Sequence, residues 1–286
     1  DEAARSLVMQ SSHLVGVLIS DIRTTHHTSG IYYIEKELSA HGYTCLIHNT
    51  GLDENSWVSY IQSLSQRKIE ALILVGSIYQ SETVREAVSL YLPSVPVVIS
   101  NGYMEGDNIY GILSDEQSGV SDCVRLLAEK RRKHPAFLMN HATPSNELKR
   151  AGFEAGMAQH FPAEPLREFI CGNEFETILA IARGILQKNP DIDCLICSED
   201  LLAVIMLRVL ADLGKRVPED VMLIGINNSV YAEVCIPSLT SLDNMLYDVS
   251  MAAAHNILGL LSGQRVSRKM FVSTEIVERE STALPD

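Results

Sequence analysis

Two polar residues that could bind a small molecule follow apolar segments of this 286-residue chain. Glu199 comes shortly after the apolar run 194–197 (CLIC), and Asn227 comes directly after the run 221–226 (VMLIGI). Such runs are typical of parallel strands covered by helices on both faces, and ligands bind at the carboxyl ends of those strands. We therefore predict that Glu199 accepts hydrogen bonds from a ligand and that Asn227 donates and accepts them. The alternatives are a first-turn acid that complements the helix dipole and a turn residue with a special backbone angle.

The sequence shows no pattern typical of catalysis or metal binding. It has no nucleophile elbow, no P-loop and no GxGxxG after a strand, and its nine histidines lack HExxH spacing. Cys194 and Cys197 have metal or redox spacing, but residues three apart on a strand point to opposite faces. We interpret them as core residues with free thiols in a reducing cytoplasm. We expect no enzyme, no metal and no cofactor.

The charge balance bears on the partners of the chain. Acidic residues outnumber Lys plus Arg by 36 to 23, giving a net charge of −13 and no net basic field to hold a nucleic-acid backbone. The basic cluster 130–133 falls at a predicted helix end, where cations complement the helix dipole. We therefore interpret it as a solvated helix terminus and not as a nucleic-acid contact. No apolar run is long enough to cross a membrane, and the N-terminal segment does not resemble a secretory signal.

The elements that must position these residues alternate between strand and helix. Short connections between them predict right-handed crossovers and parallel, doubly wound sheets. Because the alternation occurs in two sets, we predict two similar α/β lobes. The expected strands cover residues 14–20, 43–48, 71–75, 97–100, 109–113, 136–140, 168–171, 194–197, 221–226 and 270–279. The expected helices cover residues 29–41, 53–66, 82–91, 115–130, 146–159, 174–187, 199–213 and 246–261.

The segment 217–243, VPEDVMLIGINNS…IPSLTSLD, resembles the effector-binding core of the LacI/GalR family of bacterial transcription regulators. Shorter matches follow in the family's order at residues 3–7, 14–21, 42–43, 72–77, 114–119, 152–153, 198–203 and 279–282. The resemblance implies a periplasmic-binding-protein-like fold of two lobes joined by three crossings, near Arg131, Asp243 and Ser273. The implied division is a hinge-helix remnant or linker at 1–12, an N-terminal lobe of 13–131 plus 244–272, and a C-terminal lobe of 132–243 plus 273–286.

The resemblance also implies a function. A small metabolite, a sugar or sugar derivative, would bind in the interlobe cleft and control DNA binding allosterically, so that effector and operator shift each other's affinity by the same factor. Operator DNA would be bound by an N-terminal helix-turn-helix that this chain does not contain. The implied protein is a cytoplasmic homodimer, not bound to a membrane. The alternatives are a periplasmic-type solute-binding protein for transport and a sugar-processing enzyme on the same fold; the hinge-like residues 3–7 favour the regulator.

Several positions depart from the family pattern. Thr24-Thr25-His26-His27 stand where Asn-Pro and two aromatic residues are usual, and Lys149 stands at a ligand-facing position that is often Arg. The alternative for Lys149 is a solvated helix charge, and the alternative for the segment with His26 and His27 is a polar loop at the rim of the cleft. Phe175 is either an apolar wall of the ligand site or a core residue. Glu199 is acidic where the family has Asn, and Asn227 is an amide where the family has an acidic residue. Asp200 is expected to cap or rigidify the start of the helix and not to touch the ligand. The predicted effector-binding residues are Asp21, His26, His27, Ser77, Asp115, Lys149, Phe175, Glu199 and Asn227.

Overall fold

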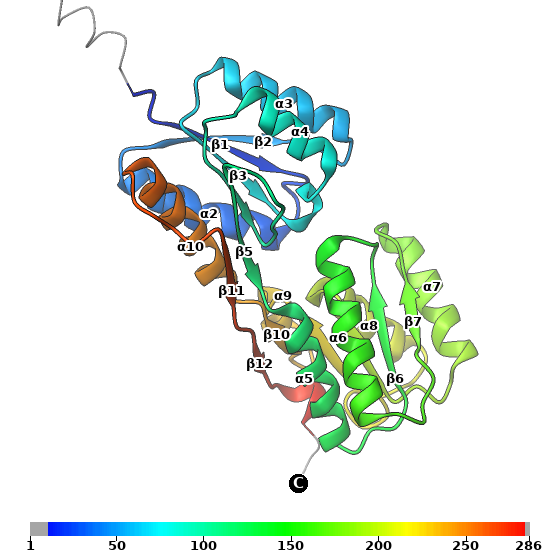
Figure 1. Ribbon diagram of the computed structural model, residues 1–286. Helices are drawn as coiled ribbons and strands as arrows, with labels where there is room; N and C mark the ends of the chain where they lie inside the picture. The colour runs from blue at the N-terminus through cyan, green and yellow to red at the C-terminus, as the bar shows by residue number, and fades with distance from the viewer. Residues whose placement is uncertain (1–10, 284–286) are drawn as a thin grey trace, which may run out of the picture. The chain divides into compact units, whose positions relative to one another are not determined.

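The computed structural model describes residues 11–283, which form two compact units (Figure 1). Unit 1 contains the described residues up to Leu113 together with Leu246–Phe271. Unit 2 contains Ser114–Met245 together with the described residues from Val272 onward. Each unit has a mostly parallel sheet between helices, so the predicted two-lobe α/β architecture is confirmed. Residues 1–10, which make up most of the predicted hinge-helix remnant, lie outside the described residues.

The sheet of unit 1 has six strands in the order β11-β5-β4-β3-β1-β2. Helices α3 and α4 pack together on one face, and α2 and α10 pack together on the other (Figure 1). The strands are β1 (Leu14–Ile19), β2 (Thr44–Asn49), β3 (Ala71–Val75), β4 (Val97–Ser100), β5 (Ile109–Ser114) and β11 (Lys269–Val272). The helices are α2 (Thr25–Ala40), α3 (Glu54–Gln66), α4 (Glu82–Tyr91), α10 (Leu246–Leu261) and the 3-10 turn η1 (Ser77–Tyr79).

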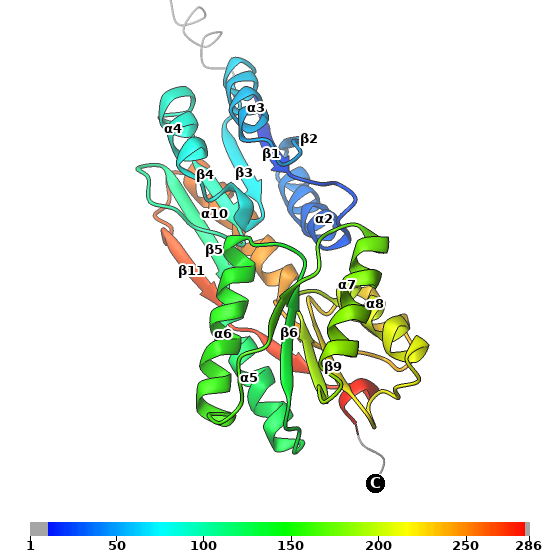
Figure 2. The ribbon, with the colours of Figure 1, turned by 90° about the vertical axis from the view of Figure 1, so that its right-hand side faces the viewer.

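The sheet of unit 2 also has six strands, in the order β12-β10-β9-β8-β6-β7, with only β12 antiparallel to its neighbour. Figure 2 shows β6 and β9 of this sheet. The strands are β6 (Pro135–Met139), β7 (Glu168–Ile170), β8 (Cys194–Cys197), β9 (Met222–Ile226), β10 (Thr240–Asp243) and β12 (Glu275–Val277). The helices are α5 (Glu116–Glu129), α6 (Pro144–His160), α7 (Phe175–Lys188), α8 (Asp200–Asp212), α9 (Val230–Val234) and the 3-10 turn η2 (Glu280–Thr282).

Strand β8 shows why its two cysteines are structural. Cys194 packs in the core cluster that contains Phe137 and Phe153, while Cys197 packs in the cluster that contains Leu195 and Met206. The two thiols therefore face opposite sides of the sheet, as predicted, and both are free. Burial raises the pKa of each thiol well above its ordinary value, which keeps the reactive thiolate scarce.

The first boundary between the units lies between Leu113 and Ser114, whereas the sequence analysis placed it near Arg131. Helix α5 belongs to unit 2 because it packs closely against α6. A Cβ atom on Gly152 of α6 would lie 2.2 Å from the carbonyl oxygen of Gln117 of α5, so only a glycine allows this approach. The other two crossings, after Met245 and after Phe271, lie within a few residues of the predicted positions.

The single strand predicted over 270–279 is wrong. The structure has β11 in unit 1 and β12 in unit 2, because the chain passes from one unit to the other at this point. Ser273 and Thr274 separate the two strands, and the Thr274 hydroxyl donates to the carbonyl oxygen of Asp115 at 3.3 Å. Within residues 11–283, no helix combines the length and the apolar character that a membrane crossing requires.

Candidate functional site

Four polar residues lie where the parallel strands of unit 2 end, and they form two hydrogen-bonded pairs. Asn140 follows β6, Glu199 lies two residues after β8, Asn227 follows β9 and Asn244 follows β10. The Asn140 amide donates to Glu199 Oε1 at 2.6 Å, and the Asn244 amide donates to Asn227 Oδ1 at 3.0 Å. We refer to these four residues as the carboxyl-edge cluster. Because it combines one carboxylate with three amides, it suits a ligand rich in hydroxyl groups.

Glu199 is the charged member of the carboxyl-edge cluster. It occupies the N-cap position of α8, but its side chain makes no capping hydrogen bond. The side chain is partly exposed, and within the described residues it forms no ion pair. Glu199 lies at the amino end of α8, where a carboxylate complements the helix dipole, and its second oxygen can also accept from a ligand.

Asp200, the next residue, is directed into the protein. It is 1% exposed, and its carboxylate accepts from Ser229 N at 2.7 Å, Ser229 Oγ at 2.8 Å and Ser241 Oγ at 2.6 Å. These bonds join the start of α8 to the loop after β9 and to β10. Asp200 thus holds the segments that carry Glu199 and Asn227, which agrees with its predicted rigidifying role.

We expect Asp200→Ala to lower the free energy of unfolding by about 2 kcal/mol, because it leaves buried donors without their acceptor. The loss should depend on pH. Burial raises the pKa of Asp200 above its ordinary value of 3.8, so the folded chain binds this proton more readily than the unfolded chain. Its contribution therefore falls as pH rises from 3.8 through the folded pKa. Urea denaturation should show a larger wild-type-minus-variant difference near about pH 4 than near about pH 7, and the reverse order would contradict this assignment.

Lys149 lies inside unit 2. Its side chain is 7% exposed, which excludes a solvated helix charge. The ammonium nitrogen lies 3.4 Å from Glu116 Oε1, 3.1 Å from the carbonyl oxygen of Ser198 and 3.4 Å from Asn146 Oδ1. An ammonium has three N–H donors, and three protein acceptors surround this one. Lys149 therefore joins α5, α6 and the end of β8, where the sequence analysis expected it to face a ligand.

The remaining candidates of unit 2 differ in their surroundings. Asn227 has φ of 106°, so it takes the special backbone angle of the alternative interpretation, yet its side chain still belongs to the carboxyl-edge cluster. Asp115 is the N-cap of α5 and accepts from Ser118 N at 3.2 Å. Phe175 is 44% exposed, with the Arg208 guanidinium over its ring, so it is not a core residue.

Unit 1 brings its four candidates to the carboxyl ends of β1 and β3. Asp21 lies two residues after β1, and a hydrogen bond from Arg23 holds its pKa below the ordinary value. Ser77 is buried at the start of η1. A Cβ atom on Gly76 would lie 3.3 Å from His27 Nε2, so the turn before Ser77 packs against that imidazole.

The polar loop predicted at His26 and His27 is wrong. Helix α2 begins at Thr25, with Thr24 as its N-cap, and not after Ser29. Thr28 N donates to the carbonyl oxygen of Thr24 at 3.0 Å, which closes the first helical turn around the two histidines. The helix fixes the direction of both rings, which are tilted against each other with centroids 5.8 Å apart.

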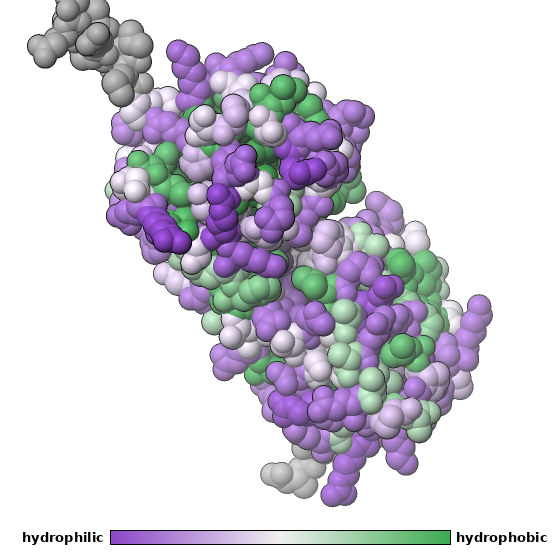
Figure 3. Space-filling model, in the orientation of Figure 1, coloured by the Kyte–Doolittle hydropathy of each residue, from purple (hydrophilic) through white to green (hydrophobic). Residues whose placement is uncertain are grey.

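Two other features of unit 2 lie apart from the candidate residues. Phe169, Ile181 and Ile185 line an apolar groove of about 490 Å³ between β7 and α7, where Figure 3 shows apolar side chains gathering.

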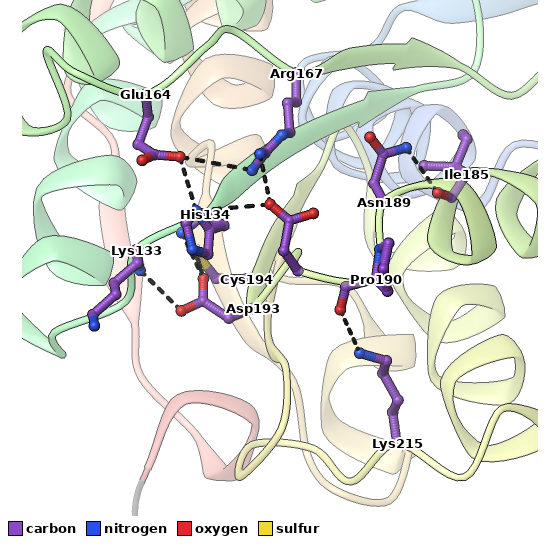
Figure 4. Close-up of polar contacts among 11 residues, drawn as sticks. Lys133, His134, Glu164, Arg167, Ile185, Asn189, Pro190, Asp193, Cys194 and Lys215 are labelled. Atoms are coloured by element: carbon purple, nitrogen blue, oxygen red, sulfur yellow. Dashed lines mark hydrogen bonds and ion pairs between the residues drawn. The ribbon is translucent and has the colours of Figure 1, made fainter.

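At the amino end of β6, His134 Nδ1 lies 2.8 Å from Glu164, and Arg167 points toward the same carboxylate (Figure 4). Asp193 accepts from the backbone nitrogens of Lys133 and His134, so this cluster fastens the start of the strand. Among residues 11–283, no group of His, Cys, Asp and Glu has a metal-binding arrangement.

Comparison with known proteins agrees with the two-unit fold. A family model described as a periplasmic binding protein-like domain matches residues 124–282, more than half of the chain. An HTH-type transcriptional regulator of Lachnoclostridium phytofermentans is 27% identical over 282 residues, which cover 98% of this chain and 85% of that protein. The chain belongs to the LacI/GalR family. A second member, the ribose operon repressor of Halalkalibacterium halodurans, is 23% identical over 282 residues that cover 98% of this chain and 82% of that protein.

The fold matches solved structures of the same family. One is a periplasmic binding protein/LacI transcriptional regulator from Alkaliphilus metalliredigens, complexed with D-xylulofuranose. The TM-score is 0.81 at 21% identity, and the match covers 95% of this chain and 100% of that one. The LacI/GalR fold predicted from the sequence is therefore confirmed.

Asn140, Asn244 and Glu116 are polar residues that were not predicted and that contact the candidate residues. Asn140 and Asn244 both follow strands, so the rule that selected Glu199 and Asn227 could have found them. Glu116, the acid beside Lys149, gave no such signal. It follows the helix cap Asp115 and looks like an ordinary first-turn acid, whereas the structure shows it 1% exposed.

Proposed function

We propose that this LacI/GalR chain is the effector-binding core of a cytoplasmic bacterial transcription repressor. A small sugar-like metabolite would bind at the carboxyl ends of the strands, and this binding would change the affinity for operator DNA. The single observation that carries the proposal is the carboxyl-edge cluster, which stands at the strand ends where ligands of open α/β sheets bind. The relative named for a ribose operon and the structural neighbour bound to D-xylulofuranose support a sugar-like ligand.

Reciprocity follows from this function. If the metabolite changes the affinity for operator DNA by a factor, typically ~5 to 150-fold, DNA changes the affinity for the metabolite by the same factor. The affinity for the metabolite should therefore be measured with and without operator DNA, on a protein that carries the expected N-terminal helix-turn-helix together with this chain. Equal affinities would contradict a regulator and leave the solute-binding alternative.

We expect Glu199→Ala to weaken metabolite binding by about 1–3 kcal/mol, the usual cost of removing a charged hydrogen-bond partner. The ligand would first be found by a thermal-shift screen of sugars, sugar phosphates and nucleobases, and its affinity measured by titration calorimetry. Glu176→Ala is the matched control, because Glu176 is an exposed first-turn acid of α7 and should leave the affinity unchanged. An affinity that Glu199→Ala does not change would dismiss this role.

We also propose that the chain forms a homodimer. Within unit 2, Val230, Val234 and Ile236 are 53%, 69% and 92% exposed, and a group of exposed apolar side chains in one short segment is typical of a protein–protein contact. Light scattering should give twice the chain mass of 31.6 kDa, and Ile236→Asp should weaken the dimer if this surface contributes to it. A 31.6 kDa species that persists at high concentration would refute the dimer.

A further inference from the structure

The charge of Lys149 is already balanced inside unit 2. Its ammonium lies 3.4 Å from Glu116 Oε1, and the two side chains are 7% and 1% exposed. The remaining donors point to the carbonyl oxygen of Ser198 and to Asn146 Oδ1. Within the described residues the ammonium donates to these two oxygens and faces Glu116 Oε1 as an ion pair, so a protein carboxylate already balances its charge.

Glu116 is fixed in place as firmly as its partner. The Ser145 hydroxyl donates to Glu116 Oε2, so the carboxylate is held by α6 while it belongs to α5. If Lys149 turned toward a ligand, Glu116 would remain buried without a counter-charge, which is strongly unfavourable. The pair therefore behaves as a neutral unit within the core.

The charge that unit 2 does present at its strand ends is negative. Glu199 is partly exposed, and its described partner is the neutral amide of Asn140. Asp243, at the end of β10, accepts from the Asn228 amide and from Met245 N, so it too lacks a cationic neighbour among its hydrogen-bond partners. A phosphate or carboxylate placed beside Glu199 would be repelled, whereas hydroxyl or ammonium donors would be attracted.

We infer that the effector carries no anionic group where it meets unit 2, because the buried Glu116–Lys149 pair removes the cation and Glu199 supplies an acceptor. This inference rests on the proposed function and narrows its ligand class to a polyhydroxylated metabolite without phosphate or carboxylate. Glu116 is then a specificity-determining residue that acts through Lys149 without touching the ligand.

The first test uses inorganic phosphate as the probe and needs no knowledge of the effector. We expect the thermal midpoint of the wild-type chain to be the same in potassium phosphate and in potassium chloride of equal ionic strength. In Glu116→Gln, which keeps an acceptor for Ser145 but frees the ammonium, phosphate should raise the midpoint in a saturable way. Adding Lys149→Met to this variant should abolish that gain. A saturable gain in the wild-type chain that Lys149→Met removes would overturn the inference, even if Glu116→Gln does not fold.

The second test uses matched ligands in titration calorimetry. D-ribose, D-glucose and their amino, phosphate and carboxylate derivatives are compared with each compound that the thermal-shift screen identifies. For any scaffold that binds, the neutral or amino form should bind at least about tenfold tighter than its anionic forms, since one charged contact has that magnitude. Tighter binding of the anionic form would overturn the inference. If no metabolite binds and none changes DNA affinity, the proposed function fails, while the phosphate test still decides the state of Lys149.

Discussion

Replacing Lys149 by methionine should lower the free energy of unfolding by about 3–5 kcal/mol, the cost of breaking a buried ion pair by removing one partner. Methionine keeps the length of the side chain, so the loss arises from Glu116, which stays 1% exposed without its counter-charge. The acceptors on Ser198 and Asn146 also lose their donor. Urea denaturation monitored by circular dichroism would measure the effect.

The neighbouring residue provides the control for this prediction. Arg150 lies on the same helix, is 40% exposed and pairs with Glu147 at 2.9 Å, so Arg150→Met should cost less than about 1 kcal/mol. The double variant Lys149→Met/Glu116→Gln should recover much of the lost stability, because it removes the buried charge that the single variant leaves unpaired. Equal losses at positions 149 and 150 would show that Lys149 is not buried in solution.

The strands could be predicted from the sequence because burial on both faces leaves continuous apolar runs. Leu195 and Ile196 illustrate this, since both are fully buried and point to different core clusters. The position of a polar residue after such a run also predicted the edge of the sheet at which that residue lies. Parallel strands end at one edge of a sheet, so Glu199 and Asn227 were each expected at the edge where ligands bind.

The partners of those residues could not be predicted in the same way. The Glu116–Lys149 pair depends on how α5 docks against α6, and the apolar periodicity of a helix fixes which face is buried but not its neighbour. The boundary near Arg131 was misplaced for the same reason. The sequence shows α5 following a strand of unit 1, and only the docked structure shows that Val120 and Val124 complete the core of unit 2.

The start of α2 shows a different limit. Ser29 is a good N-cap residue by type, and Thr24 is one too, so the local sequence left two possible helix starts. The structure selects Thr24 although its side chain makes no capping hydrogen bond. This choice places His26 and His27 in the first turn of α2, where the His27 ring packs beside Gly76.

Gly152→Ala should lower the free energy of unfolding by about 3 kcal/mol, at the upper end of the cost of overpacking a core. The added methyl group would lie 2.2 Å from the carbonyl oxygen of Gln117, which is backbone and cannot move unless α5 moves with it. Because Glu116 precedes Gln117, the same shift would pull the carboxylate away from Lys149. The variant should therefore lose stability and also gain a phosphate-dependent rise in its thermal midpoint.

Gly184→Ala separates this effect from the ordinary preference of helices for alanine. Gly184 lies within α7, and a Cβ atom there would have nothing within 4 Å. Alanine should therefore raise the free energy of unfolding by about 0.5–1 kcal/mol, through helix propensity alone. The effect of Gly→Ala on the free energy of unfolding thus has opposite signs in two helices of one unit. At Gly152 the clash with a neighbouring backbone outweighs the helix propensity of alanine, and at Gly184 there is no such clash. A stabilising Gly152→Ala would mean that α5 and α6 do not approach so closely, and the buried pair between them would then lose its structural basis.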